Sequence, residues 1–146
     1  MNDSEIYLKE KEDAQLYYKS IEYVFSPFLN EKVHFNSEGF NHLIYKNRRE
    51  ERDRSSQLLR FKLLFLAQHL VNLSTTHQEF EQVFDADKST LFWGIIAIIE
   101  KRKIKVILKK VGNGQINFWS VIPAWKTSKY RDIKIFHTMD GDPHTD

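Results

Sequence analysis

The sequence predicts a single α+β domain in which N-terminal helices pack on a small antiparallel β-sheet. Two observations predict this class. In the first half of the chain apolar residues recur at spacings of three and four, whereas in the second half they alternate or form short β-branched runs around a Gly-Asn-Gly turn. The length of 146 residues suits one domain, and no repeat or shift in composition divides it.

The first predicted helix runs from about Glu10 to Phe25. Its apolar residues fall on one helical stripe: Ala14, Tyr17, Tyr18, Ile21, Val24 and Phe25. Ser26-Pro27 ends it, because the residue before a proline is disfavoured in the helical region. We expect this acidic segment, residues 1–31, to form an N-terminal helical extension of the domain.

The next stretch predicts a strand and two helices. Apolar and polar residues alternate over 33–36, as in a short strand. Ser37 is a candidate N-cap for a brief helix. Residues 46–54 are almost all charged and predict a solvent-facing loop, after which Ser55 and Ser56 are candidate caps of a longer helix ending near Leu73. That helix carries leucines at spacings of three and four, at Leu59, Leu63, Leu66, Leu70 and Leu73.

The second half predicts an antiparallel meander. Residues 91–99 read LFWGIIAII, a buried strand, and residues 104–109 alternate so that one face is largely basic. Gly112-Asn113-Gly114 predicts a hairpin turn to a partner strand over 116–122, which Pro123 ends. A further edge strand is expected over 130–137, and the tail 137–146 is expected to be disordered.

Composition narrows the function classes. The chain has no cysteine, which excludes disulfides, thiol catalysis and cysteine-based metal sites. No apolar run is long enough to cross a bilayer, and the polar first residues argue against a signal peptide, so we expect a cytoplasmic protein without a membrane partner. The net charge of +2 conceals blocks of opposite sign: residues 32–75 carry +4 and residues 101–136 carry +9. These two basic blocks are candidates for contacting a polyanion.

Two stretches also carry a resemblance to a known family. They read VHFNSEGFNHLIYKNRR followed by SSQLLRFKLL, and FWGIIAIIEKRKIKVILKKVGNGQINFWSVI. Over about 33–122 the chain resembles the phage-associated branch of the barnase–EndoU–colicin–RelE ribonuclease superfamily. The resemblance implies a RelE-like fold and a toxin-like or phage-derived endoribonuclease that uses no metal or other cofactor. It further implies tRNA or mRNA as substrate and a protein antitoxin or inhibitor as a second partner.

Such cleavage needs a base for the ribose 2′-hydroxyl, an acid for the leaving 5′-oxygen and cations for the phosphate. His42 is the first candidate for proton transfer, and a helical spacing of four places Lys46 on the same face. Arg60 lies within an apolar helix, where a cation either snorkels to solvent or points into a pocket. The resemblance implies Ser120 as a phosphate or hydroxyl contact. These four are the predicted catalytic residues.

The predicted RNA-binding residues flank these positions in both basic blocks. Trp119 is either a base-stacking platform or a core residue, and strand alternation separates it from Ser120 unless the strand bulges. The remaining candidates are His34, Arg48, Arg49, Arg52, Lys105, Lys109 and Asn117. A second function stays open: a non-catalytic nucleic-acid-binding or protein-interaction domain that uses the same basic surface.

Overall fold

The computed structural model describes residues 1–46, 49–99 and 102–124. Within these ranges the chain is α+β, as predicted, with three helices and six strands. They are α1 (Asp3–Ile21), β1 (Tyr23–Ser26), β2 (Glu31–His34), α2 (Ser37–Ile44), α3 (Arg54–Leu73), β3 (Glu79–Asp85), β4 (Lys88–Ile99), β5 (Arg102–Val111) and β6 (Ile116–Ala124). The edge strand expected over 130–137 and the disordered tail expected over 137–146 lie outside the described residues.

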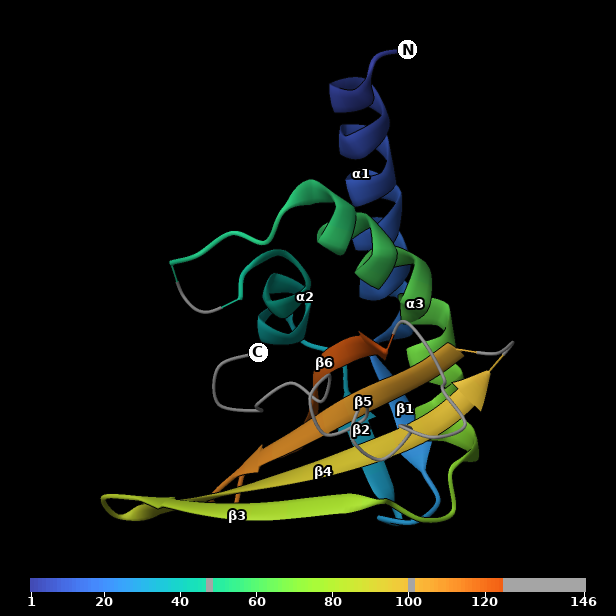
Figure 1. Cartoon of the computed structure of the whole chain (residues 1–146). Coiled ribbons are helices and arrows are strands. Elements are labelled where there is room, and N and C mark those ends of the chain that lie inside the picture. The colour runs from blue at the N-terminus through green and yellow to red at the C-terminus, as the bar shows by residue number, and fades with distance from the viewer. Residues whose placement is uncertain (47–48, 100–101, 125–146) are drawn as a thin grey trace, which may run out of the picture.

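The strands form one open sheet in the order β1-β2-β6-β5-β4-β3 (Figure 1). Neighbours are antiparallel except β2 and β6, which run parallel and pair Val33 with Ile116 and His34 with Asn117. The prediction of a purely antiparallel sheet was therefore wrong. The β1–β2 hairpin lies along the edge of β6 that faces away from β5, and β2 runs in the same direction as β6.

α1 begins and ends earlier than predicted. Asn2 caps its N-terminus, where the Asn2 side chain accepts a hydrogen bond from the N–H of Glu5 at 2.8 Å. The helix stops at Ile21 because Glu22 takes a positive φ of 60°, which a right-handed helix does not allow. Val24 and Phe25, which were assigned to the helical stripe, instead belong to β1 and pair with β2.

The N-termini of α2 and α3 are capped by side-chain oxygens that accept hydrogen bonds from the backbone. The capping residue lies one position before the predicted cap of α2 and two positions before the first predicted cap of α3. Asn36 caps α2 by accepting from the N–H of Gly39, at 3.2 Å. Asp53 caps α3 by accepting from the N–H of Ser56, at 2.8 Å. The span of α3, from Arg54 to Leu73, otherwise agrees with the leucine spacing.

The meander contains one strand that the sequence pattern did not predict, β3, which pairs with the first half of β4. The predicted turn over 112–114 is confirmed, with Gly112 at a φ of 54°. β6 continues past the predicted stop, and Pro123 pairs with Ile104 near its end.

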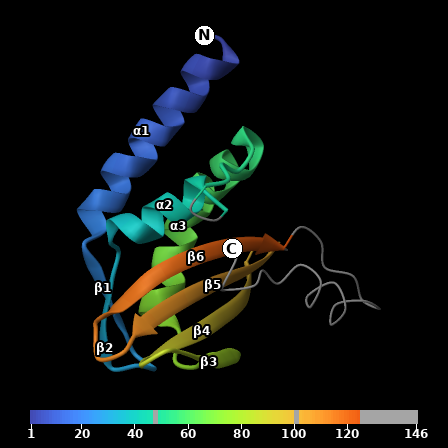
Figure 2. The same ribbon diagram turned by 90° about the vertical axis from the view of Figure 1, so that its left-hand side faces the viewer.

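α3 lies against one face of the sheet and α1 packs along α3 (Figure 2). Side chains from all three layers, including Tyr18, Leu64, Val106 and Phe118, fill the main core. The alternate residues of the central strands form a second apolar cluster on the other face, made of Phe92, Ile107, Trp119 and Ile122 with Val83 beside it.

Candidate functional site

The candidate site lies where α2 meets β5 and β6. The imidazole of His42, on α2, packs on the indole of Trp119, on β6, with ring centroids 3.9 Å apart and planes tilted by 44°. The Nζ of Lys109, on β5, lies 3.7 Å from the centroid of the same indole, which is a cation–π distance. One tryptophan thus contacts both an imidazole and an ammonium group.

Glu38 completes this group. Its Oε1 lies 3.9 Å from the Nζ of Lys109, and its side chain is 58% exposed. Glu38 is one helical turn before His42, so both side chains project from the same face of α2 toward the sheet. We call Glu38, His42, Lys109 and Trp119 the α2–β6 cluster. Glu38 was not among the predicted site residues, although its spacing of four from His42 was a readable signal.

α2 is fixed in place by contacts at both ends. At its start, the hydroxyl of Tyr18 donates to the carbonyl oxygen of Asn36 at 2.6 Å, and burial raises the pKa of Tyr18, which keeps this donor protonated. At its end, the Nε of Arg52 donates to the carbonyl oxygen of His42 at 3.0 Å, and the N–H of Arg52 donates to Ile44 at 2.8 Å. The position of His42 relative to Trp119 is therefore set by main-chain contacts of α2.

A β-bulge occurs in β6 at the tryptophan. Phe118 pairs with Leu108 and Ser120 pairs with Ile107, so Trp119 is an extra residue with no partner of its own in the β5–β6 register. Because of the bulge, simple alternation no longer separates Trp119 from Ser120, which was the main obstacle to placing both at one site.

Arg60 and Ser120 are brought together, as predicted, but both are buried. Arg60 is 5% exposed and Ser120 is 0% exposed. The Nη1 of Arg60 lies 3.5 Å from the hydroxyl oxygen of Ser120 and also donates to the carbonyl oxygen of Val121. Because this guanidinium donates to the backbone of β6, it links α3 to the sheet. This favours a structural role for Arg60 over contact with a phosphate.

Lys46 does not share a helical face with His42, because α2 ends at Ile44. Tyr45 forms a bridge with Glu51, and the N–H of Lys46 donates to the carbonyl oxygen of Glu50 at 2.7 Å. The prediction that a helical spacing of four pairs Lys46 with His42 was therefore wrong. Lys46 is exposed in the connection that follows α2.

The predicted RNA-binding arginines differ in their surroundings. Arg49 is exposed, whereas Arg52 is buried at the end of α2, where it holds the carbonyl of His42. Arg52 therefore positions α2 and is not part of an accessible phosphate-binding loop. Arg48 lies outside the described residues.

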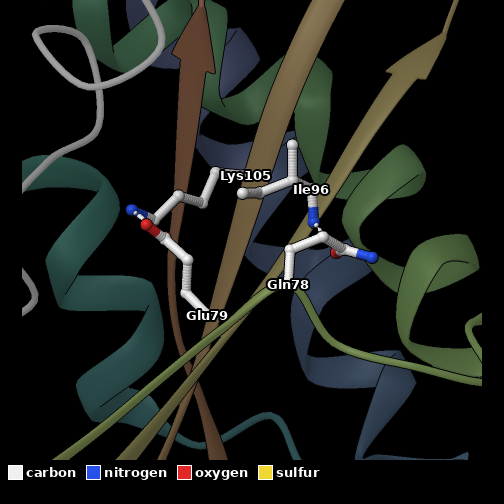
Figure 3. A network of polar contacts seen from close by, with 4 residues as sticks. All are labelled: Gln78, Glu79, Ile96 and Lys105. Atoms are coloured by element: carbon white, nitrogen blue, oxygen red, sulfur yellow. Dashed lines mark hydrogen bonds and ion pairs between the residues drawn. The ribbon is translucent and has the colours of Figure 1, made fainter. Parts of the chain in front are cut away.

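The basic face of β5 is partly neutralised. Lys105 is buried, and its Nζ lies 2.5 Å from the Oε1 of Glu79 on β3 (Figure 3). Of the predicted RNA-binding lysines, Lys109 thus belongs to the α2–β6 cluster and Lys105 to a contact between strands. His34 and Asn117 are register partners, are both half-buried, and lie on the strands just before the bulge.

Among the residues that the structure describes, no group of three or more His, Asp or Glu side chains is arranged to hold a metal ion. None of the described helices is long and apolar enough to cross a membrane. Comparisons of the sequence and the structure with known proteins found no matching family, no matching curated protein and no matching solved structure. The ribonuclease resemblance consequently rests on the sequence stretches quoted above.

Proposed function

We propose that this protein is a metal-independent endoribonuclease whose reacting groups are those of the α2–β6 cluster. The observation that carries the proposal is that Glu38 and His42 share one face of α2, with Glu38 near the ammonium of Lys109 and His42 packed on the same indole as that ammonium. A carboxylate, an imidazole and a cation within one small site supply the three functions that RNA transesterification requires.

In the proposed reaction the carboxylate of Glu38 removes the proton of a ribose 2′-hydroxyl. The 2′-oxygen then forms a bond to the adjacent phosphorus, while the bond from phosphorus to the 5′-oxygen breaks. The imidazolium of His42 gives its proton to the departing 5′-oxygen. The products are a 2′,3′-cyclic phosphate and a free 5′-hydroxyl. Lys109 stabilises the negative charge that grows on the phosphate in the transition state.

The surroundings of the cluster support this division of roles. Glu38 is exposed, as a group that must reach a substrate hydroxyl should be. His42 is half-buried and packs on the indole of Trp119, which fixes the orientation of its ring beside the cluster. Arg60 and Ser120 act as structural support of β6 in this proposal.

The proposal is tested by incubating the purified full chain with a mixed RNA in excess EDTA and analysing the ends of the products. We expect cleavage with cyclic phosphate ends. Glu38→Gln and His42→Gln should each lower kcat by about a hundredfold or more, the usual contribution of a general acid or base. Glu12→Gln and His69→Gln are matched controls, because both residues are exposed on other helices, and both should leave the rate unchanged.

A second function is favoured by the burial of Arg60 and Ser120, which removes two of the four predicted catalytic groups from contact with a substrate. In that case the chain binds RNA through Lys109 and the exposed basic residues without cutting it. Salt-sensitive RNA binding with no cleavage by the wild-type chain would establish this function and reject the nuclease.

A further inference from the structure

β3 is the last strand of the sheet and pairs on one side only, with β4 (Figure 1). Its ladder is unbroken from Glu79 to Asp85, and Glu79 and Asp85 pair with Gly94 and Lys88. The outer edge of β3 therefore presents backbone N–H and C=O groups that no described strand uses. Natural sheets usually protect such an edge with a proline, a bulge or charged side chains, lysine above all. β3 contains no proline, lysine or bulge, and its three charged residues are all acidic, so it is guarded against acidic strands but not against basic ones.

The edge is preformed, because β3 is held firmly on its inner side. The ammonium of Lys105 contacts the carboxylate of Glu79, and the side-chain oxygen of Gln78 accepts from the N–H of Ile96 at 2.7 Å (Figure 3). Phe80 packs beside Trp93 with ring centroids 5.8 Å apart. An incoming strand would therefore meet a preformed strand with an unbroken ladder on its other side.

The two faces of β3 differ in chemistry. Phe80 and Phe84 share one face and are 52% and 75% exposed, which is unusual for phenylalanine. The other face carries the acidic side chains, Glu79, Glu81 and Asp85. A strand that pairs with this edge would place alternate side chains beside the two phenylalanines and beside the carboxylates.

A second copy of the chain is a poor occupant. Antiparallel pairing of β3 with itself that keeps like faces together and extends over more than half of the strand can be centred on Glu81, Gln82 or Val83. These registers place Glu81 opposite Glu81, Glu79 opposite Asp85, and Glu81 opposite Asp85, respectively. Like charges directly opposite each other destabilise a strand pair, so each register is disfavoured, the one centred on Gln82 least because Glu79 is also paired with Lys105.

We propose that the outer edge of β3 is a docking site for an extended segment of a partner protein in which lysine or arginine alternates with apolar residues. The basic side chains would lie beside Glu81 and Asp85, the apolar ones beside Phe80 and Phe84, and the main chain would extend the six-stranded sheet by one strand. This site is separate from the α2–β6 cluster and does not depend on the ribonuclease proposal.

The test uses the full chain and a fluorescein-labelled peptide of alternating lysine and valine, about as long as β3. We expect fluorescence anisotropy to show binding and hydrogen exchange to show protection of the β3 amides. An analogue with glutamate in place of lysine should not bind, and neither should one with proline at its central positions, because proline removes the main-chain donors.

On the protein side, Glu81→Lys/Asp85→Lys should weaken binding about tenfold or more, since it replaces attraction by repulsion at two cross-strand positions. Glu10→Lys/Glu12→Lys makes the same change of charge on exposed acids of α1 and should bind the peptide as the wild type does. Circular dichroism checks that both variants fold. If the β3 variant does not fold, binding of the three peptides to the wild-type chain still tests the proposal.

Four results would overturn the proposal, three of them in the peptide experiments. The lysine peptide does not bind; or the proline analogue binds equally well, which means charge attraction without strand addition; or the β3 variant binds with unchanged affinity. A concentration-dependent dimer of the wild-type chain that Phe84→Ser abolishes would also overturn it, because the edge would then be occupied by a second copy.

Discussion

The imidazole of His42 packs on the indole of Trp119, although 76 positions separate them in the chain, and their ring centroids are 3.9 Å apart. They meet because α2 packs against β6 beside the bulge that frees Trp119 from the strand register. The same indole lies 3.7 Å from the ammonium of Lys109. Trp119 is therefore the residue that orients the acid and the cation of the proposed reaction.

Replacing this indole should affect cleavage according to the ring that remains. Trp119→Phe keeps an aromatic face, whereas Trp119→Leu keeps apolar volume without one. Since a cation–π contact contributes about 1 kcal/mol, we expect kcat/KM for RNA to fall about fivefold further in the leucine variant than in the phenylalanine variant. The value of kcat/KM for each variant is measured under conditions in which the same fraction of the protein is folded. Equal rates in the two variants would show that the indole serves only as packing.

Replacing Arg60 tests whether this residue stabilises the fold or contacts the substrate. Arg60→Met should lower the free energy of unfolding by about 2 kcal/mol, because the carbonyl of Val121 loses a buried donor. Denaturant unfolding measures this change, and Lys62→Met on the exposed side of α3 is the control. The cleavage rate per folded molecule should stay close to that of the wild type. A loss of rate without a loss of stability would instead place Arg60 in contact with the substrate.

The spacing of apolar residues and glycines along the chain predicted those helices and turns that are specified by their own residues. The leucine spacing defined α3, and the glycines of 112–114 defined the β5–β6 hairpin. β3 was missed because an edge strand is wetted on both faces, so its phenylalanines and acids show no clear division into a core side and a solvent side. The parallel pairing of β2 with β6 joins distant segments and leaves no local trace.

The candidate site was predicted in part for the same reason. His42, Lys109 and Trp119 were each candidates, and His42 and Lys109 both contact Trp119, whereas the predicted catalytic group joined His42 to Lys46, Arg60 and Ser120. Lys46 was paired with His42 through a helix that in fact ends at Ile44, where a local bridge between Tyr45 and Glu51 follows and Arg52 donates to the last helical carbonyls. The bulge at Trp119 depends on the register between β5 and β6, which spacing within one strand does not encode.

The cap of α3 makes a pH-dependent contribution to stability. The hydrogen bond from the N–H of Ser56, followed by that from the hydroxyl of Ser55, lowers the pKa of Asp53. Because the folded-state pKa lies below the unfolded one, the stabilisation is full above the unfolded value of about 3.9 and is lost as the pH falls through the folded pKa.

Asp53→Asn keeps an acceptor oxygen but has no charge to titrate. We therefore expect the difference in Tm between the wild type and Asp53→Asn to shrink as the pH is lowered from 7 toward 3. Thermal unfolding followed by circular dichroism measures it. Asp53→Ala removes the cap at every pH and should be less stable than Asp53→Asn at neutral pH. A constant difference between wild type and Asp53→Asn would contradict the proposed linkage.

Gly39 sets how closely α2 approaches the sheet, and through it the geometry of the α2–β6 cluster. A Cβ at this position would lie 2.5 Å from the hydroxyl oxygen of Tyr18 and 2.6 Å from the carbonyl oxygen of Phe118. In an exposed helix the change from glycine to alanine stabilises by about 1 kcal/mol, but forcing atoms into a packed contact costs about 1–3 kcal/mol. Since the backbone of β6 cannot move aside without disturbing the sheet, we expect Gly39→Ala to be destabilising.

The same substitution should also reduce cleavage. Relief of the clash pushes α2 outward, which carries Glu38 and His42 away from Lys109 and Trp119. The free energy of unfolding and the cleavage rate per folded molecule are both measured, with Ser37→Ala on the exposed start of α2 as the control. If Gly39→Ala is instead more stable and equally active, α2 does not need this close approach, and the placement of Glu38 and His42 must depend on other contacts.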